Sequence, residues 1–170
     1  MKNIYILPTD KPSRLFIDVD DNKLKITIPI GGEHMMNQNI YITNNEEIKE
    51  RDYCISHLNI IDEGKIHNSQ TIFNPKTKEH LILLQSCKKI ILTTNTDLIK
   101  DGVQAIDDEF LEWFVKNPIC EVVKIETFEV EDYIGFAGHT SYPTFYNEYK
   151  IIIPKEEPKQ DFDNRKKYDL

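Results

Sequence analysis

The chain has 170 residues, of which 39% are hydrophobic and 29% charged, and its formal net charge is −8. This length and composition are typical of one globular domain that can bury its own core. No apolar run reaches the roughly 18 residues that a membrane-spanning helix needs. The first apolar run, residues 4–7, is shorter than the roughly 7–15 residues of a secretory signal, so we expect a cytoplasmic protein.

Short segments with strand-like patterns dominate the chain. In residues 23–30 every second residue is leucine or isoleucine, as in a strand with one buried face. Turn-forming Asp, Asn, Gly and Pro residues separate such segments. The expected strands cover residues 3–7, 14–19, 23–30, 39–43, 52–56, 57–61, 71–73, 80–85, 88–93, 121–131 and 148–154. This pattern predicts a mainly β (α+β) fold over residues 1–153, built as a small antiparallel barrel or a sandwich.

The longest expected strand, residues 121–131, alternates apolar and acidic side chains. Its expected inward residues are Val123, Ile125, Phe128 and Val130. The alternation changes parity after Ile125, which predicts a β-bulge near Glu126–Thr127. Glu129 and Glu131 are then expected on the solvent-facing side.

One main helix is predicted at about residues 107–117, within "QAIDDEFLEWFVKNP". Asp107 is a good N-cap residue, and Pro118 prevents the helix from continuing. Its expected apolar face consists of Phe110, Leu111, Phe114 and Val115. Trp113 lies at the edge of this face, where we expect it to be half exposed. Before this helix, "TNTDLIKDG" predicts a single helical turn that Thr94 or Thr96 caps and Gly102 ends.

The negative charge is concentrated in residues 97–132, which contain eleven acids and three bases and thus account for the whole net charge. Two explanations remain open: a solvated face that favours solubility, or an acidic patch that attracts a basic partner. Either one disfavours a nucleic-acid groove here, because phosphates require clustered Lys and Arg. The candidate partner-binding residues are Glu112, Trp113, Glu126, Glu129, Glu131 and Asp132.

No sequence motif indicates a metal or cofactor site. The histidines, His34, His57, His67, His80 and His139, lack the spacings of metal ligands. The cysteines, Cys54, Cys87 and Cys120, include no CxxC pair, so we expect three buried or half-buried thiols. Neither a phosphate-binding glycine loop nor a GxSxG nucleophile motif is present.

The stretch 132–149, "DYIGFAGHTSYPTFYNEY", is the candidate loop site, with His139, Tyr142 and Tyr146 as its candidate residues. Long loops often carry function. The alternative is a hairpin made mostly of strand, with a short tip. After it, residues 154–170 contain ten charges, which predicts a mobile tail; a docking motif around Phe162 and Tyr168 is its alternative.

Three stretches resemble a family of accessory proteins from phages, prophages and mobile elements of Bacteroidota. They are "EHMMNQNIYITNNEEIKERDYCI", "CKKIILTTNTDLIKDGVQAIDDEFLEWFVKNP" and "YKIIIPKEEPKQ", and the resemblance covers most of residues 33–160. It carries over no activity and no residue role. It implies a small accessory protein of a phage or prophage that lies in the cytoplasm of the bacterial host and acts in host takeover or counter-defence.

Three functions from different classes therefore remain. The first is non-enzymatic binding of a basic host or defence protein through the acidic residues 97–132, for example inhibition of a CRISPR–Cas nuclease. The second is a small β-barrel that binds nucleic acid or a nucleotide. The third is an enzyme that uses the 132–149 loop. The absence of catalytic motifs disfavours the enzyme, and the charge disfavours direct nucleic-acid binding.

Overall fold

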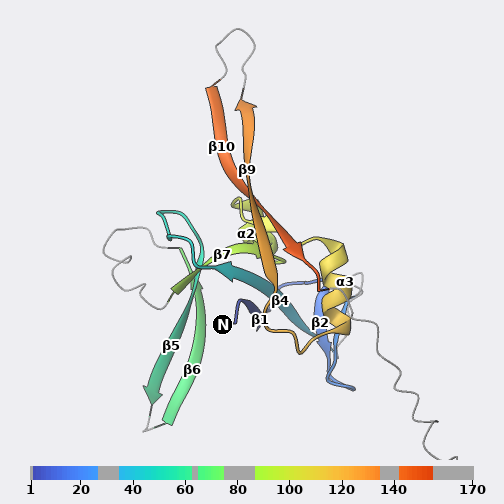
Figure 1. Cartoon of the computed structure of the whole chain (residues 1–170). Coiled ribbons are helices and arrows are strands. Elements are labelled where there is room, and N and C mark those ends of the chain that lie inside the picture. The colour runs from blue at the N-terminus through green and yellow to red at the C-terminus, as the bar shows by residue number, and fades with distance from the viewer. Residues whose placement is uncertain (1, 27–34, 63–64, 75–86, 135–141, 155–170) are drawn as a thin grey trace, which may run out of the picture.

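The computed structural model describes residues 2–26, 35–62, 65–74, 87–134 and 142–154. It confirms a mainly β protein with antiparallel sheets and two short helices (Figure 1). The described strands form one eight-stranded sheet and one two-stranded hairpin, and they do not close into a barrel. The expected strand at 80–85 and nearly all of the expected tail lie outside the described residues. Within the described part, no helix has the length and apolarity to cross a membrane.

Most strand and helix positions follow the sequence pattern, but several boundaries differ. The expected strands 52–56 and 57–61 form one continuous strand, Cys54–Asp62, and the short strand Gln104–Ala105 was not expected. Three strands begin earlier than expected, at Met35 instead of residue 39, at Lys65 instead of residue 71 and at Tyr142 instead of residue 148, and the expected strand 121–131 spans Lys124–Ile134. The large sheet contains β1 (Ile4–Pro8), β2 (Leu15–Asp18), β3 (Leu24–Ile26), β4 (Met35–Asn44), β5 (Cys54–Asp62), β6 (Lys65–Phe73), β7 (Cys87–Thr93) and β8 (Gln104–Ala105). The hairpin consists of β9 (Lys124–Ile134) and β10 (Tyr142–Ile152), and the helices are α2 (Thr96–Lys100) and α3 (Asp108–Lys116).

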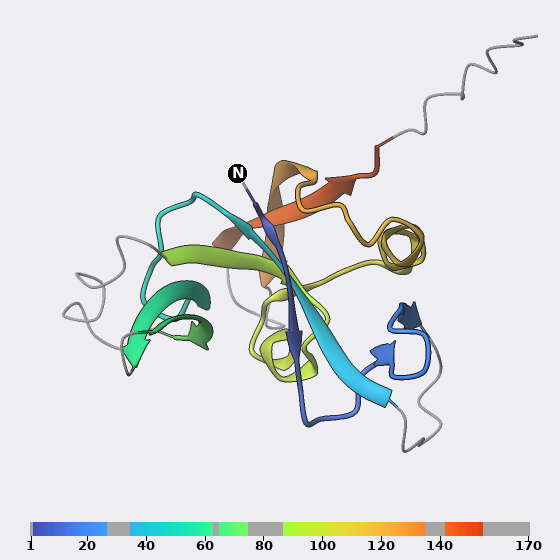
Figure 2. The same cartoon turned by 90° about the horizontal axis from the view of Figure 1, so that it is seen from below.

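Strand β4 lies at the centre of the large sheet, whose order is β3-β2-β4-β7-β5-β6 with β1 also paired to β4. Its residues from Gln38 to Thr43 are all buried, so both faces of the strand are covered. Ile40 and Ile42 pack on one side against α3. Tyr41 packs on the other side, in the core that contains Leu98 of α2. Figure 2 shows the two helices on opposite sides of β4.

Helix α3 forms as the sequence predicts. The Asp107 carboxylate accepts a hydrogen bond from the Phe110 backbone N–H at 2.7 Å, which caps the helix. Phe110, Leu111 and Phe114 are buried, and Trp113 is half-buried beside Phe110. The cap of α2, in contrast, is Asn95 instead of Thr94 or Thr96. Its side chain accepts from two backbone N–H groups of the first turn.

The prediction for the inward residues of β9 is wrong beyond Ile125. Phe128 is 47% exposed, although Val123 is buried as expected. The β9–β10 register runs without a shift from Lys124 to Ile134, so there is no bulge near Glu126–Thr127. The parity change has another cause: the hairpin leaves the body after Ile125, and residues farther out have no core to face.

The cysteines of the described chain are free thiols, one buried and two half-buried, as the sequence predicts. Cys54 is the buried one, and burial raises the pKa of its thiol to about 12. A thiol that stays protonated is a weak nucleophile, which fits a packing role for this residue.

Replacing Phe114 by alanine should destabilise the protein by about 3–5 kcal/mol, the usual loss for a buried phenylalanine. Its ring is 1% exposed and stacks on Phe110 with the ring centroids 5.5 Å apart. Urea unfolding of Phe114→Ala measures the loss. Glu112→Ala, at an exposed site of the same helix, is the control and should change stability by less than about 0.5 kcal/mol. A similar small effect for both variants would show that Phe114 is not part of the core.

Candidate functional site

Two side-chain amides attach the β9–β10 hairpin to the body. The Asn3 amide donates to the Val123 carbonyl at 2.8 Å and accepts from the Val123 N–H at 3.0 Å. The Gln104 amide does the same at Tyr149, donating to its carbonyl at 2.7 Å and accepting from its N–H at 2.8 Å. Each amide thus replaces one residue of a neighbouring strand. The base of the hairpin is therefore held at the residue before β9 and on β10.

Beyond this base the hairpin extends away from the rest of the molecule (Figure 1). Three of its large aromatic side chains are about half exposed: Phe128 at 47%, Phe145 at 58% and Tyr146 at 49%. A two-stranded hairpin is at best marginally stable in water without further packing. Aromatic side chains that gain nothing from the core are therefore candidates for contact with a partner.

The register sorts the hairpin residues onto two faces. Ile125, Tyr149 and Ile151 share the inner face, which packs on the body at the base. Farther out, the inner face carries Glu129, Glu131, Phe145 and Asn147. The outer face carries Glu126, Phe128, Val130, Asp132, Tyr146 and Glu148. Glu129 and Glu131 thus share a face with Ile125, but both are exposed to solvent, as expected.

Several acids of residues 97–132 are neutralised by bases from the N-terminal segment. Asp97 pairs with Lys11, and Asp108 pairs with Arg14 at 2.6 Å. Glu121 pairs with Lys2 at 3.5 Å. These three carboxylates all lie on the body, where Asp101, Asp107, Glu109 and Glu112 make no ion pair within the described chain.

The hairpin acids Glu126, Glu129 and Asp132 make no ion pair with any described residue. Glu112 lies elsewhere, on α3, where it borders a shallow hollow together with Lys25 and Lys116. The structure therefore groups Glu126, Glu129, Glu131 and Asp132 on one projecting element. It places Glu112 and the half-buried Trp113 on another.

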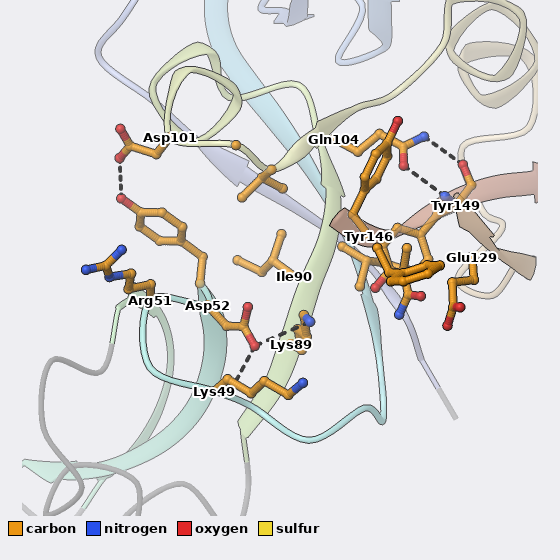
Figure 3. Close-up of a pocket in the computed structure, with 16 residues that line it drawn as sticks. Lys49, Arg51, Asp52, Lys89, Ile90, Asp101, Gln104, Glu129, Tyr146 and Tyr149 are labelled. Carbon is orange, nitrogen blue, oxygen red and sulfur yellow. Dashed lines mark hydrogen bonds and ion pairs between the residues drawn. The ribbon is translucent and has the colours of Figure 1, made fainter. Parts of the chain in front are cut away.

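A cavity of about 510 Å³ lies between the hairpin and the body (Figure 3). Its walls come from the 49–53 turn, from β7, from residues 101–104 and from β10. Such a volume is in the range of ligand sites in proteins. The side chains that determine its chemistry are Lys49, Arg51, Asp52, Tyr53, Lys89, Asp101, Gln104, Glu129, Phe145, Tyr146, Asn147 and Tyr149.

The 49–52 turn places two cations at the rim of this cavity. The Asp52 carboxylate accepts from the Lys49 backbone N–H at 2.8 Å, and the Asp52 N–H donates to the Lys49 carbonyl at 3.0 Å. Arg51 has a φ of 81°, a left-handed conformation that disfavours side chains other than glycine and asparagine. The Asn74 side chain holds it there by donating to the Arg51 carbonyl at 2.8 Å.

The charges inside the cavity are only partly compensated. Asp52 pairs with Lys89 at 3.3 Å, and the Asp101 carboxylate accepts from the Tyr53 hydroxyl at 2.5 Å. Lys49 and Arg51 make no ion pair with any carboxylate of the described chain. They lie across the close-up from Glu129 and Tyr146 (Figure 3). The cavity therefore has a cationic side at the turn and an aromatic, acidic side at the hairpin.

The expected 132–149 loop is mostly strand, as its alternative predicted. Tyr146 is on β10 and lines the cavity. His139 and the side chain of Tyr142 lie outside the described residues. The described side chains include none of the five histidines, and the described residues contain no group of three His, Cys, Asp or Glu that could hold a metal.

Sequence reasoning missed Lys49, Arg51 and Gln104. None of them belongs to a motif, and they are distant in sequence from the hairpin. Phe145 lies inside the stretch that was singled out, and its position between two tyrosines was the one available signal.

Comparison of this chain with protein-family models, with curated proteins and with solved structures finds no match in any of the three.

Removing the Gln104 amide should loosen the hairpin before the rest of the fold. In Gln104→Ala the Tyr149 N–H and carbonyl lose their partner, a loss of about 1–3 kcal/mol. Amide hydrogen exchange of β9 and β10 should become faster, while exchange in β4 and β7 stays unchanged. Lys150→Ala, at the exposed neighbouring residue, is the control. Equal exchange in both variants would show that Gln104 does not hold the hairpin.

Alkaline pH should weaken the same attachment through Tyr149. Its hydroxyl donates to the Glu46 carboxylate at 2.9 Å, and burial together with this bond raises the pKa of Tyr149 to about 12 from an ordinary 10.0. The stabilisation is complete below pH 10 and is lost as the pH rises towards about 12, because only the neutral phenol fits the site. Tyr149→Phe should therefore show a shallower decline of unfolding free energy over this range. An unchanged slope would contradict the raised pKa.

Proposed function

We propose that this protein acts by binding another protein, and that the outer half of the β9–β10 hairpin makes the contact. The observation that carries the proposal is the placement of Phe128, Phe145 and Tyr146, which are about half exposed on a projecting element. Aromatic side chains of this kind supply a large contact area and are enriched among the residues that dominate binding energy. In the monomer these exposed parts of the three side chains contribute nothing to the packing of the core.

The partner surface that fits this hairpin is basic. Glu126, Glu129, Glu131 and Asp132 follow one another along β9, around the exposed Phe128. Carboxylates at the rim of aromatic anchors speed association with a positively charged partner and exclude negatively charged ones. Proteins that handle nucleic acids expose basic surfaces. A nuclease of the host or of its defence systems is therefore the partner class that we propose, in line with the resemblance to phage accessory proteins.

The same charges favour a protein partner over a nucleic acid. Phosphate groups would meet the carboxylates of Glu126, Glu129 and Asp132, which make no ion pair with any described residue, and would be repelled. The hairpin has two basic residues, Lys124 and Lys150. They pair in register with Ile152 and Glu126, close to the body and far from the outer end of the hairpin. A stripe of bases that could follow a phosphate backbone is therefore missing from the described hairpin.

A matched pair of charge reversals tests the proposal. Glu126→Lys with Asp132→Lys changes the outer face of the hairpin, whereas Glu109→Lys with Glu112→Lys makes the same change in net charge on α3. Partners are first identified by affinity purification from the native host, with mass spectrometry of both protein and RNA. Association rates with the purified partner are then measured over a salt series. We expect the hairpin pair to slow association by about tenfold or more at low salt and the α3 pair to change it far less.

The single variant Phe128→Ala separates anchoring from charge. We expect it to speed dissociation about tenfold or more and to leave the unfolding free energy within about 0.5 kcal/mol of the original. Equal effects of the two charge-reversed pairs, together with unchanged dissociation of Phe128→Ala, would contradict binding through the hairpin. Recovery of RNA without a protein partner would favour the nucleic-acid alternative instead.

A further inference from the structure

The edge of β10 that faces the cavity is open to hydrogen bonding. At Tyr149 the backbone N–H and carbonyl both bond to the Gln104 side chain, so they point away from β9. In an antiparallel pair this direction alternates, and every second residue of a strand points its backbone groups the same way. The register of β9 and β10 is unbroken, so Asn147 and Phe145 also direct their N–H and carbonyl groups to the outside.

These outward groups lie at the cavity. Both Phe145 and Asn147 line it, and no other group of the described residues bonds to their outward backbone N–H or carbonyl. An open strand edge of this kind is a template for one more strand. The Gln104 amide already acts as the first residue of such a strand, at Tyr149.

We propose that the cavity receives an extended segment of the partner protein, which adds to β10 as a further strand along Phe145 and Asn147. This inference rests on the proposed function, because it names the part of a partner protein that this surface recognises. Main-chain hydrogen bonds give such an addition its affinity, and the cavity walls select its side chains. The strand is short: Gln104 occupies the edge at Tyr149, and Pro143 offers a carbonyl but no N–H.

The charges of the cavity select an acidic segment. Lys49 and Arg51 line the side away from the hairpin and make no ion pair within the described chain. Of the lining carboxylates, Asp52 pairs with Lys89, Asp101 accepts from the Tyr53 hydroxyl, and Glu129 lies on the hairpin, across the cavity from these two cations. A glutamate of the segment that reaches the turn would therefore be attracted to it. The rings of Tyr53, Phe145 and Tyr146 provide contact for apolar side chains at the positions between.

Short strand-forming peptides provide the probe. We would use acetylated, amidated peptides about six residues long in which valine alternates with glutamate, lysine or serine. Binding is measured by fluorescence polarisation of a labelled peptide. We expect the glutamate peptide to bind at least tenfold more tightly than the lysine peptide. The double variant Lys49→Glu with Arg51→Glu should reverse this order.

Backbone pairing has its own readout. Methylating the peptide amides one at a time should weaken binding at every second position, because only alternate N–H groups of an added strand face β10. On the protein, Phe145→Pro removes one outward N–H without removing a bond to β9, whereas Phe145→Ala removes the ring and keeps the N–H. Phe145→Pro should weaken binding about tenfold more than Phe145→Ala, with the hairpin amides of both still protected from exchange.

The inference is overturned if none of the peptides binds at millimolar concentration, if methylation weakens binding without alternation, or if the two Phe145 variants bind alike. It is also overturned if sedimentation shows that a second copy of the chain occupies the edge. These failures leave the proposed function intact as long as Phe128→Ala and the outer-face charge reversals still impair partner binding. If the peptides bind as expected but Phe128→Ala and the outer-face charge reversals associate normally with the partner, the result would contradict only the proposed contact through the outer face.

Discussion

The attachment of the hairpin by two side-chain amides determines how this molecule presents its surface. Asn3 at Val123 and Gln104 at Tyr149 each satisfy one donor and one acceptor of the hairpin backbone. Each side-chain amide can pair with the backbone of only one residue. The hairpin strands are therefore not extended into the large sheet beyond Val123 and Tyr149. A strand in the same place would have covered the edge of β10. The amides therefore fix the base of the hairpin and leave its outer half open.

The distribution of charge follows from the same arrangement. Acids near the body meet Lys2, Lys11 and Arg14, which the N-terminal segment places beside them. The hairpin extends beyond the reach of these bases. Exposed ion pairs contribute little stability, about 0–1 kcal/mol each. Their effect here is to cancel three acidic charges on the body, whereas Glu126, Glu129 and Asp132 on the hairpin make no ion pair within the described chain.

Local patterns predicted the parts of the fold that local interactions determine. Asp107 and Pro118 delimit α3, and alternating residues mark most strands. The alternating pattern did not predict which residues of β9 are buried, because alternation shows only that one face of a strand is apolar and the other polar. Whether the apolar face meets a core depends on where the strand leaves the body, at Ile125. The cavity was not predictable in this way, because its walls come from a turn, a central strand and a hairpin that are distant in sequence.

The two proposed surfaces share β10, and this constrains any partner that uses both. A segment paired with Phe145 and Asn147 would lie directly beside Tyr146, whose ring belongs to the outer face but also reaches the cavity. The rest of the partner would then continue over the outer half of the hairpin, where the charge is negative. The segment meets Lys49 and Arg51 at its other side. A partner that matches both proposed surfaces would therefore carry an acidic extended segment next to a basic surface.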